Sequence, residues 1–198
     1  EYPGGGGNSQ IVLKGAQAQN EKQVFTLLMQ ELRAQLETLK QNTGREYQLT
    51  AAVSGTNAKT QAIDWQKTIP FMDYVFAMTY DFAVGDGQAG HHANLFSYDD
   101  NGLSTENMIN NLIDAGVPAN KLAVGIAFYS RGWTNSGWQG ADDSQGMGLS
   151  DKRFDDTSQS ISTKGYAYKE LITNPPVGFE YGYDSEVEAA YFFNPKTK

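Results

Sequence analysis

Residues 73–82 read DYVFAMTYDF, and this stretch decides the fold class. Between Asp73 and Asp81 the run is nearly continuously apolar, which is typical of a strand buried on both faces of a parallel sheet. A second candidate strand, 47–53 (YQLTAAV), precedes it, and a third, 121–129 (KLAVGIAFY), follows it. The sequence therefore predicts three strands of one buried sheet.

Helices are predicted before and between these strands. In 21–42 leucines recur at helical spacing, and Asn20 stands where an N-cap is expected. Shorter helices are predicted over 59–69 and over 104–115, the latter capped by Ser104. Strands that alternate with helices are typical of βα units and a parallel sheet.

The pattern changes after Arg131. Residues 132–198 are rich in Gly, Ser, Asp and Tyr, with short alternating segments and one helix predicted over 165–172. We interpret 1–131 as part of an α/β barrel, a partial TIM (β/α)8 barrel, and 132–198 as a small α+β subdomain. Three parallel strands do not close a barrel, which needs about eight, and we expect the chain to be part of a larger fold.

Composition and charge exclude several classes of function. The formal net charge of −8 and the pI near 4.7 argue against binding to nucleic acid or to an anionic membrane surface. The absence of cysteine excludes thiolate catalysis and disulfides. The two histidines, His91 and His92, have no carboxylate at ligand spacing, and neither a metal nor a cofactor is expected. The first residue is Glu1 rather than Met, and we expect the natural protein to start upstream.

The ends of the predicted strands carry the polar residues that chemistry requires. In α/β barrels, catalytic groups lie at the carboxyl ends of the strands. That rule selects Glu1, which would follow a strand outside this chain, the Tyr80–Asp81 pair, and the pair formed by Tyr129 and Arg131. These groups are expected to meet on one rim. Aromatic residues are abundant enough to offer flat surfaces to sugar rings, although composition alone does not select that substrate.

Four segments resemble, in order, the signatures of family 18 glycoside hydrolases, the chitinases. Residues 1–5 (EYPGG) resemble the end of the DxxDxDxE-Y-P-G-G signature, and 73–82 resemble the D-Y-hydrophobic-M-[ST]-Y-D-F strand. Residues 90–95 (GHHANL) are similar to the G-H-x-[ST]-x-L loop. Residues 127–133 (AFYSRGW) are similar to the Y-G-R-G-W strand end, with Ser where Gly is usual. The tail resembles the α+β module that bacterial chitinases insert after the seventh strand.

The resemblance implies a chain that runs from the end of strand four through strand seven and the insertion. It implies a retaining mechanism in which the sugar's own acetamido group is the nucleophile, with Glu1 as general acid and then base and Tyr80 orienting the acetamido group. Further substrate contacts are implied for Met78, Asp81, Tyr129 and Arg131. The signature aspartates and the Trp of strand eight lie outside this chain. The usual Glu of the insertion is missing, since 162–165 read STKG.

Structural alternatives remain open for several of these residues. Glu1 is alternatively a residue at a frayed terminus, but the Tyr-Pro-Gly-Gly that follows it favours the catalytic interpretation. The Tyr80–Asp81 pair is alternatively a core tyrosine with a loop-capping carboxylate, but the flanking motif favours the functional interpretation. Arg131 is as well suited to an ion pair as to substrate. The two histidines favour loop hydrogen bonding. Two tryptophans remain: Trp65 lies in a predicted helix and favours the core, whereas Trp138 lies in a predicted loop and is the better sugar platform.

The sequence therefore predicts an enzyme that hydrolyses chitin, the β-1,4-linked polymer of N-acetylglucosamine, with chitin or chitooligosaccharides as its only partners. The resemblance also implies a secreted protein that is monomeric at full length. The alternatives are an inactive chitin-binding barrel and a hydrolase of another N-acetylglucosamine glycan. Half of the barrel lies outside this chain, which favours inactivity when the chain is isolated.

Overall fold

The structure is a computed structural model that describes residues 16–100, 102–135, 158–194 and 196. The chain folds as two compact units. The first comprises Glu1–Met78 and Met108–Gly125, and the second comprises Thr79–Asn107 and Ile126–Lys198. The predicted domain boundary between residues 131 and 132 stays a prediction.

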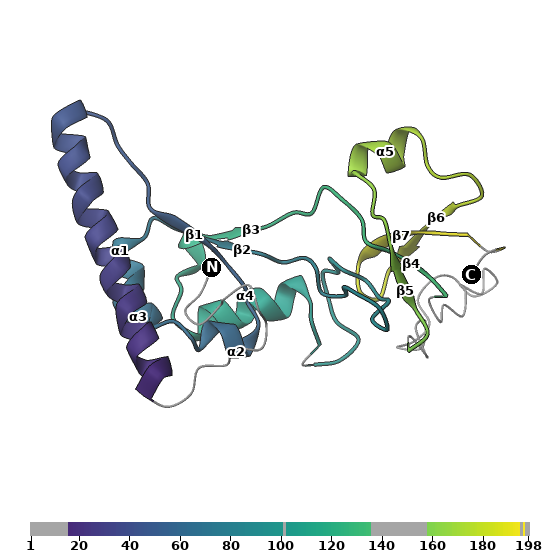
Figure 1. The fold of residues 1–198 in the computed structure, drawn as a ribbon, viewed down its shortest axis with the longest axis horizontal. Helices are drawn as coiled ribbons and strands as arrows, with labels where there is room; N and C mark the ends of the chain where they lie inside the picture. The colour runs from purple at the N-terminus through teal and green to yellow at the C-terminus, as the bar shows by residue number, and fades with distance from the viewer. Residues whose placement is uncertain (1–15, 101, 136–157, 195, 197–198) are drawn as a thin grey trace. The chain divides into compact units, whose positions relative to one another are not determined.

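A three-stranded parallel sheet forms the centre of the first unit (Figure 1). Its strands are β1 (Thr50–Val53), β2 (Tyr74–Ala77) and β3 (Leu122–Val124), in the order β1-β2-β3. All three are parallel, which confirms the arrangement predicted from the alternating strands and helices. Each strand is shorter than its predicted range.

The burial of β2 differs from the prediction. Val75 and Ala77 are completely buried, whereas Tyr74 and Phe76 are 39% and 42% exposed. The expectation of a strand buried on both faces is therefore wrong for the described residues: one face packs on helices, and the other is open. The apolar run in the sequence gives no sign of this difference, because Tyr and Phe continue the apolar pattern as Val and Ala do.

The helices of the first unit are α1 (Ala16–Thr43), α2 (Asn57–Thr60), α3 (Trp65–Thr68) and the 3-10 turns η1 (Ile69–Phe71) and η2 (Ala119–Lys121). A longer helix, α4 (Thr105–Asp114), continues from the second unit into the first. Asn20 lies inside α1, and its predicted N-cap role is wrong. The alanines and glutamines that precede it favour helix and move the start upstream.

The predicted helix over 59–69 is also wrong, since the structure breaks it into α2 and α3. Asp64 caps α3 by accepting the Lys67 N–H at 3.3 Å, and the Trp65 indole donates to the Thr60 carbonyl at 3.0 Å. The predicted cap of α4 is confirmed, because Ser104 Oγ accepts the Asn107 N–H at 3.1 Å.

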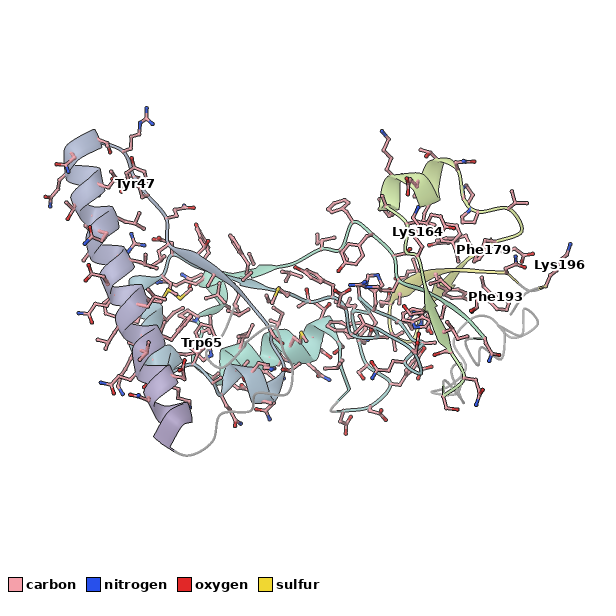
Figure 2. All side chains as sticks on the ribbon, in the orientation of Figure 1. Tyr47, Trp65, Lys164, Phe179, Phe193 and Lys196 are labelled. Carbon is pink, nitrogen blue, oxygen red and sulfur yellow. The ribbon has the colours of Figure 1, made fainter. Side chains whose placement is uncertain are left out.

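The core of the first unit lies between its sheet and its helices. It is built mainly from Val53, Trp65, Met72, Val75 and Leu112, and Trp65 is 2% exposed, which confirms its predicted place in the core (Figure 2). A bond network ties α1 to the start of β2. The Asp73 carboxylate accepts the Leu49 N–H at 2.6 Å and pairs with the Arg33 guanidinium.

The second unit contains two antiparallel pairs of strands and a short helix. The pairs are β4 (Gly132–Thr134) with β5 (Ile161–Thr163), and β6 (Glu180–Asp184) with β7 (Ala189–Phe193). The helix α5 (Tyr168–Thr173) lies close to its predicted range of 165–172. A long loop, 79–104, completes the described part of the unit.

The last part of the predicted strand 121–129 does not join the parallel sheet. It pairs with the segment before α5, where Ser130 N–H donates to Tyr166 O at 2.8 Å and Tyr168 N–H donates to Phe128 O at 2.9 Å. A Cβ added at Gly165 would lie 2.0 Å from the Ser130 carbonyl oxygen. Close main-chain packing therefore explains why glycine stands there, just before the helix.

Candidate functional site

The site begins where the chain leaves β2. Asp81 has φ +60°, the left-handed region that side chains other than glycine rarely adopt and that Asp tolerates better than most. The next residue, Phe82, donates its N–H to the His92 carbonyl at 3.1 Å. Residues held in this region of backbone space cluster at functional sites, because the surrounding structure must enforce them.

The Asp81 carboxylate lies at the centre of a hydrogen-bond cluster. Its Oδ1 accepts the Tyr129 hydroxyl at 2.8 Å and the Arg131 Nε–H at 2.8 Å, and its Oδ2 accepts Arg131 Nη2 at 2.6 Å. This two-bond contact between a guanidinium and a carboxylate fixes both groups in one plane. The guanidinium also lies 5.3 Å from the centre of the Tyr129 ring. The side chains of Asp81 and Arg131 are 33% and 41% exposed, and a ligand can therefore reach the pair.

These contacts set the charge of each member. The hydrogen bond from Arg131 holds the pKa of Asp81 below its ordinary value, and the same bond raises the pKa of Arg131. Burial and the bond to Asp81 raise the pKa of Tyr129 to about 12. At neutral pH the cluster therefore contains a carboxylate, a guanidinium and a protonated phenol.

Two further rings complete this cluster. The Tyr80 ring meets the Tyr129 ring edge to face, with centroids 6.2 Å apart and an interplanar angle of 74°. The His92 ring lies 5.4 Å from the Tyr129 ring, and its Nδ1 is 3.7 Å from Asp81 Oδ1. Burial lowers the pKa of His92 despite the nearby Asp81 carboxylate, and the ring is neutral at pH 7.

The sequence predicted loop hydrogen bonding for His92, and its carbonyl does accept such a bond, but the sequence did not predict that its ring joins the cluster. The available signal was its place in the GHHANL segment, which the family resemblance marked without assigning a role to this position.

A second carboxylate, Asp184 at the end of β6, forms a separate cluster in the same unit. Its side chain is completely buried, and its Oδ2 lies 3.1 Å from His91 Nε2. The Tyr98 hydroxyl donates to the same oxygen. The sequence did not predict this cluster, because Asp184 is separated from its partners by more than eighty residues and no motif surrounds it.

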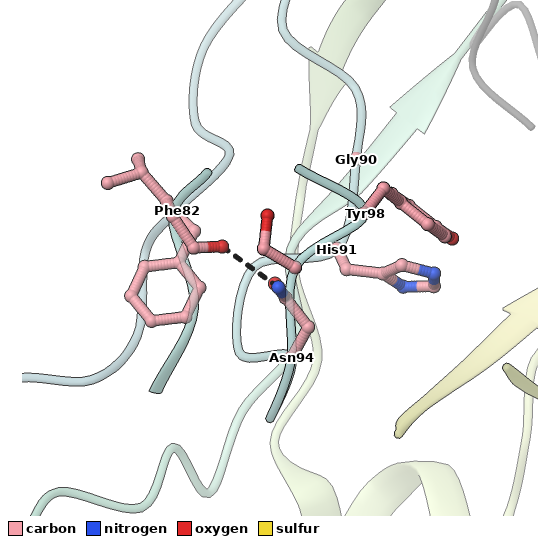
Figure 3. A pocket seen from close by; sticks show the side chains of 7 residues that line it. Phe82, Gly90, His91, Asn94 and Tyr98 are labelled. Carbon is pink, nitrogen blue, oxygen red and sulfur yellow. Dashed lines mark hydrogen bonds between the residues drawn. The ribbon is translucent and has the colours of Figure 1, made fainter. Parts of the chain in front are cut away.

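The loop that supplies His91 and Tyr98 encloses a small cavity (Figure 3). The two rings lie 6.5 Å apart at its border, and Asn94 Nδ2 donates across the loop to Leu103 O at 2.9 Å. The remaining lining residues are Phe82, Gly90 and Ser97. Of its lining residues, His91 and Tyr98 both contact the Asp184 carboxylate, and the polar group of Asn94 is used within the loop.

The other predicted site residues do not join the described cluster. Glu1 and Trp138 lie outside the described residues. Met78 is the last residue of the first unit before the division, is half-buried, and donates its N–H to Val53 O at 2.8 Å. Among the described residues, no group of three or more His, Asp or Glu side chains could hold a metal ion. No described helix has the length and apolar character needed to span a membrane.

An α/β domain whose strands lead into loops that carry a polar cluster is typical of barrel enzymes. Comparison with known proteins identifies the family. The profile described as "Glycosyl hydrolases family 18" matches residues 1–198, and the chain belongs to this family.

Its relatives are chitinases by name. Chitinase A of Pseudoalteromonas piscicida is 31% identical over 229 residues, with 98% of this chain and 27% of the relative covered. A probable endochitinase of Orgyia pseudotsugata multicapsid polyhedrosis virus is 32% identical over 200 residues, with 98% and 35% covered. The chain thus spans about a third or less of the length of these relatives.

Solved structures show the same fold. Chitinase ChiA74 from Bacillus thuringiensis superimposes with a TM-score of 0.77 at 26% identity, and the match covers 100% of this chain and 33% of the ChiA74 chain. A family 18 N-acetylglucosaminidase from Paenibacillus barengoltzii gives a TM-score of 0.73 at 26% identity, covering 98% and 54%. The chain therefore contains a partial α/β domain of the TIM-barrel type, as the sequence predicted.

Proposed function

We propose that this chain forms the part of a chitinase barrel that runs from the end of strand four through strand seven, followed by an α+β insertion. The open face of β2 supports this placement. Tyr74 and Phe76 alternate with fully buried residues, and the interior of a closed barrel would cover such side chains. Among the described residues β1 and β3 are the edges of the sheet, and further strands of a closed barrel would pair with them.

The proposed activity is hydrolysis of β-1,4-linked N-acetylglucosamine polymers with retention of configuration. The observation that carries it is the partly exposed cluster of Tyr80, Asp81, Tyr129 and Arg131. It combines an ionised carboxylate, a guanidinium, two phenols and aromatic surfaces, the groups needed to bind sugar hydroxyls and an acetamido group while leaving the sugar ring a flat contact. The names of the relatives support the same activity.

In the proposed mechanism Glu1 protonates the glycosidic oxygen as the bond to C1 breaks. The carbonyl oxygen of the 2-acetamido group attacks C1 and forms an oxazolinium ion. A water molecule, deprotonated by Glu1, then attacks C1 and releases the sugar with its original configuration. Glu1 gives up a proton in the first step and regains one from water in the second, and water is the only other reactant.

The residues of the cluster orient the substrate in this scheme. The Tyr80 hydroxyl hydrogen-bonds the acetamido group and sets its attack angle, a positioning effect. Asp81 accepts a hydrogen bond from the acetamido N–H or a hydroxyl, and Arg131 holds Asp81 ionised while its remaining N–H groups face the sugar. Tyr129 donates to Asp81 and keeps it in place. Met78 packs beneath the reacting ring, and Trp138 offers an aromatic platform. Because chitin is an insoluble polymer, the proposed enzyme acts outside the cell. The complete protein is proposed to be a monomer.

The test is the Glu1→Gln variant of the complete protein, assayed on chitotetraose. We expect turnover to fall by a factor of at least about 10³, because the general acid is lost, while binding of chitotetraose by calorimetry survives. The matched control is Glu21→Gln, which removes an exposed carboxylate of α1 and should leave both quantities unchanged. Unchanged hydrolysis in Glu1→Gln rules out the assignment, and absent hydrolysis in the unaltered protein supports a binding barrel without catalysis.

A further inference from the structure

Two consecutive histidines of the long loop each contact one of two carboxylates, Asp184 and Asp81. His91 lies against the buried Asp184, with Nε2 3.1 Å from Oδ2, and its side chain is 7% exposed. His92 packs on Tyr129 and faces Asp81. Their Cα atoms are about 3.8 Å apart, as in any trans peptide, so that fixing the first ring also fixes the main chain from which the second ring projects.

The anchor at Asp184 is rigid. The carboxylate has no solvent exposure, and its Oδ2 also accepts the Tyr98 hydroxyl. Its Oδ1 accepts the Glu186 N–H at 3.1 Å, which holds the turn between β6 and β7. At the end of the ladder Asp184 pairs with Ala189, so the hairpin and the carboxylate are held in one register. A buried carboxylate that is hydrogen-bonded in this way is strongly confined, because any movement leaves donors unsatisfied.

The ring of His92 lacks such an anchor of its own. Its Nδ1 is buried and has no hydrogen-bond partner among the described residues, since 3.7 Å to Asp81 Oδ1 exceeds hydrogen-bond distance. The ring lies against Tyr129, with 5.4 Å between the two ring centroids. The charges of Asp81 and Arg131 both act on the pKa of this ring, in opposite directions. The position of this ring thus depends on the main chain at 91–92.

We propose that Asp184 is a positioning residue for the Asp81 cluster, acting through its bond to His91, which places the His92 ring against Tyr129 and Asp81. The β6–β7 hairpin thereby controls the geometry of the Asp81 cluster. The consequence for hydrolysis rests on the proposed function, whereas the coupling between Asp184 and His92 does not.

The first test uses nuclear magnetic resonance of the full chain with labelled histidine rings. There are only two histidines, and a His92→Phe variant assigns both. Asp184→Asn should move the ring signals of His91 and also those of His92. Glu188→Gln is the matched control, because it changes a carboxylate of the same hairpin that accepts the Tyr183 hydroxyl, and it should move neither. His92 signals that stay in place in Asp184→Asn overturn the proposal.

The second test is a double-mutant cycle in the complete protein. Asp184→Asn should lower kcat on chitotetraose by about tenfold with KM changed less than about twofold, because misplacement of a positioned group affects the transition state. In a His92→Phe background, which keeps an aromatic ring on Tyr129 but removes both nitrogens, Asp184→Asn should have no further effect on kcat. Additive effects in the cycle overturn the proposal. If the unaltered protein does not hydrolyse chitotetraose, the proposed function fails, and the resonance test still decides the coupling.

Rescue variants keep the test decisive if Asp184→Asn does not fold. His91→Gln places an amide nitrogen near the position of Nε2 and should preserve the His92 signals, whereas the shorter His91→Asn should shift them. Equal His92 signals in the two variants contradict an action through this bond.

Discussion

In the second unit, the carboxylates of Asp81 and Asp184 have similar neighbours but differ in their exposure to solvent. Asp81 and Asp184 each accept a tyrosine hydroxyl and each lie beside a histidine. The Asp184 side chain has no exposure, however, whereas that of Asp81 is 33% exposed and also carries a two-bond contact from Arg131. One carboxylate is thus closed to any ligand, and the other is open to one.

This difference separates a structural carboxylate from a candidate binding carboxylate more reliably than residue type does. A buried carboxylate that has only internal partners gives rigidity and position. A carboxylate at the surface that is kept ionised by a guanidinium, on a left-handed backbone residue, keeps acceptor capacity for a substrate. The comparison therefore predicts that substitutions at Asp184 affect stability first, and substitutions around Asp81 affect activity first.

The largest expected difference concerns stability. Asp184→Asn should lower the free energy of unfolding by about 2–3 kcal/mol, because an amide leaves at least one buried donor of His91 or Tyr98 without an acceptor. Asp81→Asn should cost about 1 kcal/mol or less, since water can replace the lost contacts at an exposed pair. Urea unfolding of this chain measures both, and an equal loss in the two variants would contradict the distinction.

The next effect concerns activity. Tyr80→Phe in the complete protein should lower kcat on chitotetraose by about a hundredfold, because the acetamido group loses the hydroxyl that orients it, and should raise KM much less. Tyr183→Phe, which removes an exposed hydroxyl of β6, is the matched control and should leave kcat unchanged. Steady-state kinetics makes the comparison. A Tyr80→Phe effect confined to KM would argue against a positioning role.

A smaller effect is expected in the acid dependence of stability. The folded-state pKa of Asp81 is lowered, so its contribution to stability is present above the ordinary value of 3.8 and is lost as pH falls through the lower folded value. Arg131→Gln removes the main cause of the lowered pKa, and the contribution of Asp81 to the free energy of unfolding should therefore become smaller. Thermal unfolding from pH 6 to pH 2 should therefore show a smaller acid-side loss in Arg131→Gln than in the unaltered chain. A loss of the same size in both would show that Arg131 does not tune Asp81.

The smallest effect is spectroscopic. Because the pKa of Tyr129 is raised to about 12, one phenol of the cluster should stay protonated when ordinary tyrosines ionise near pH 10. The corresponding stability is present below the ordinary pKa and is lost as pH rises toward 12. Tyrosinate absorbance should contain a late component that Tyr129→Phe removes and Tyr168→Phe keeps. An unchanged late component would place it on another residue.

Much of the fold was predictable because it follows local pattern. The strand around Val75, the cap at Ser104 and the helix near Tyr168 each depend on neighbours in the chain, and the structure has all three. The break in the helix between Thr60 and Trp65 was not predictable, because it depends on a hydrogen bond from the Trp65 indole to the Thr60 carbonyl, which helix propensity does not describe. The open face of β2 was not predictable either, because a sequence pattern does not tell which segments cover a strand; among the described residues, Tyr74 and Phe76 stay partly exposed.

The candidate site divides in the same way. Asp81, Tyr129 and Arg131 were found from their places after predicted strands and from the family resemblance, and they do bond one another. Their roles toward a substrate remain predictions. Asp184 and the ring of His92 were missed, since the contacts that define them join residues far apart in the sequence, and no spacing rule relates a hairpin carboxylate to a histidine of an earlier loop.

The most direct measurement of the central claim, that the open carboxylate and not the closed one holds substrate, uses the two histidine rings as reporters. Chitotetraose is added to the complete protein, in its Glu1→Gln form to prevent turnover, and both ring signals are followed by nuclear magnetic resonance. The account predicts that the His92 signals shift in a saturable way while those of His91, fixed on Asp184, stay within the line width. Saturable shifts of His91 alone, or binding that moves neither ring, would contradict it.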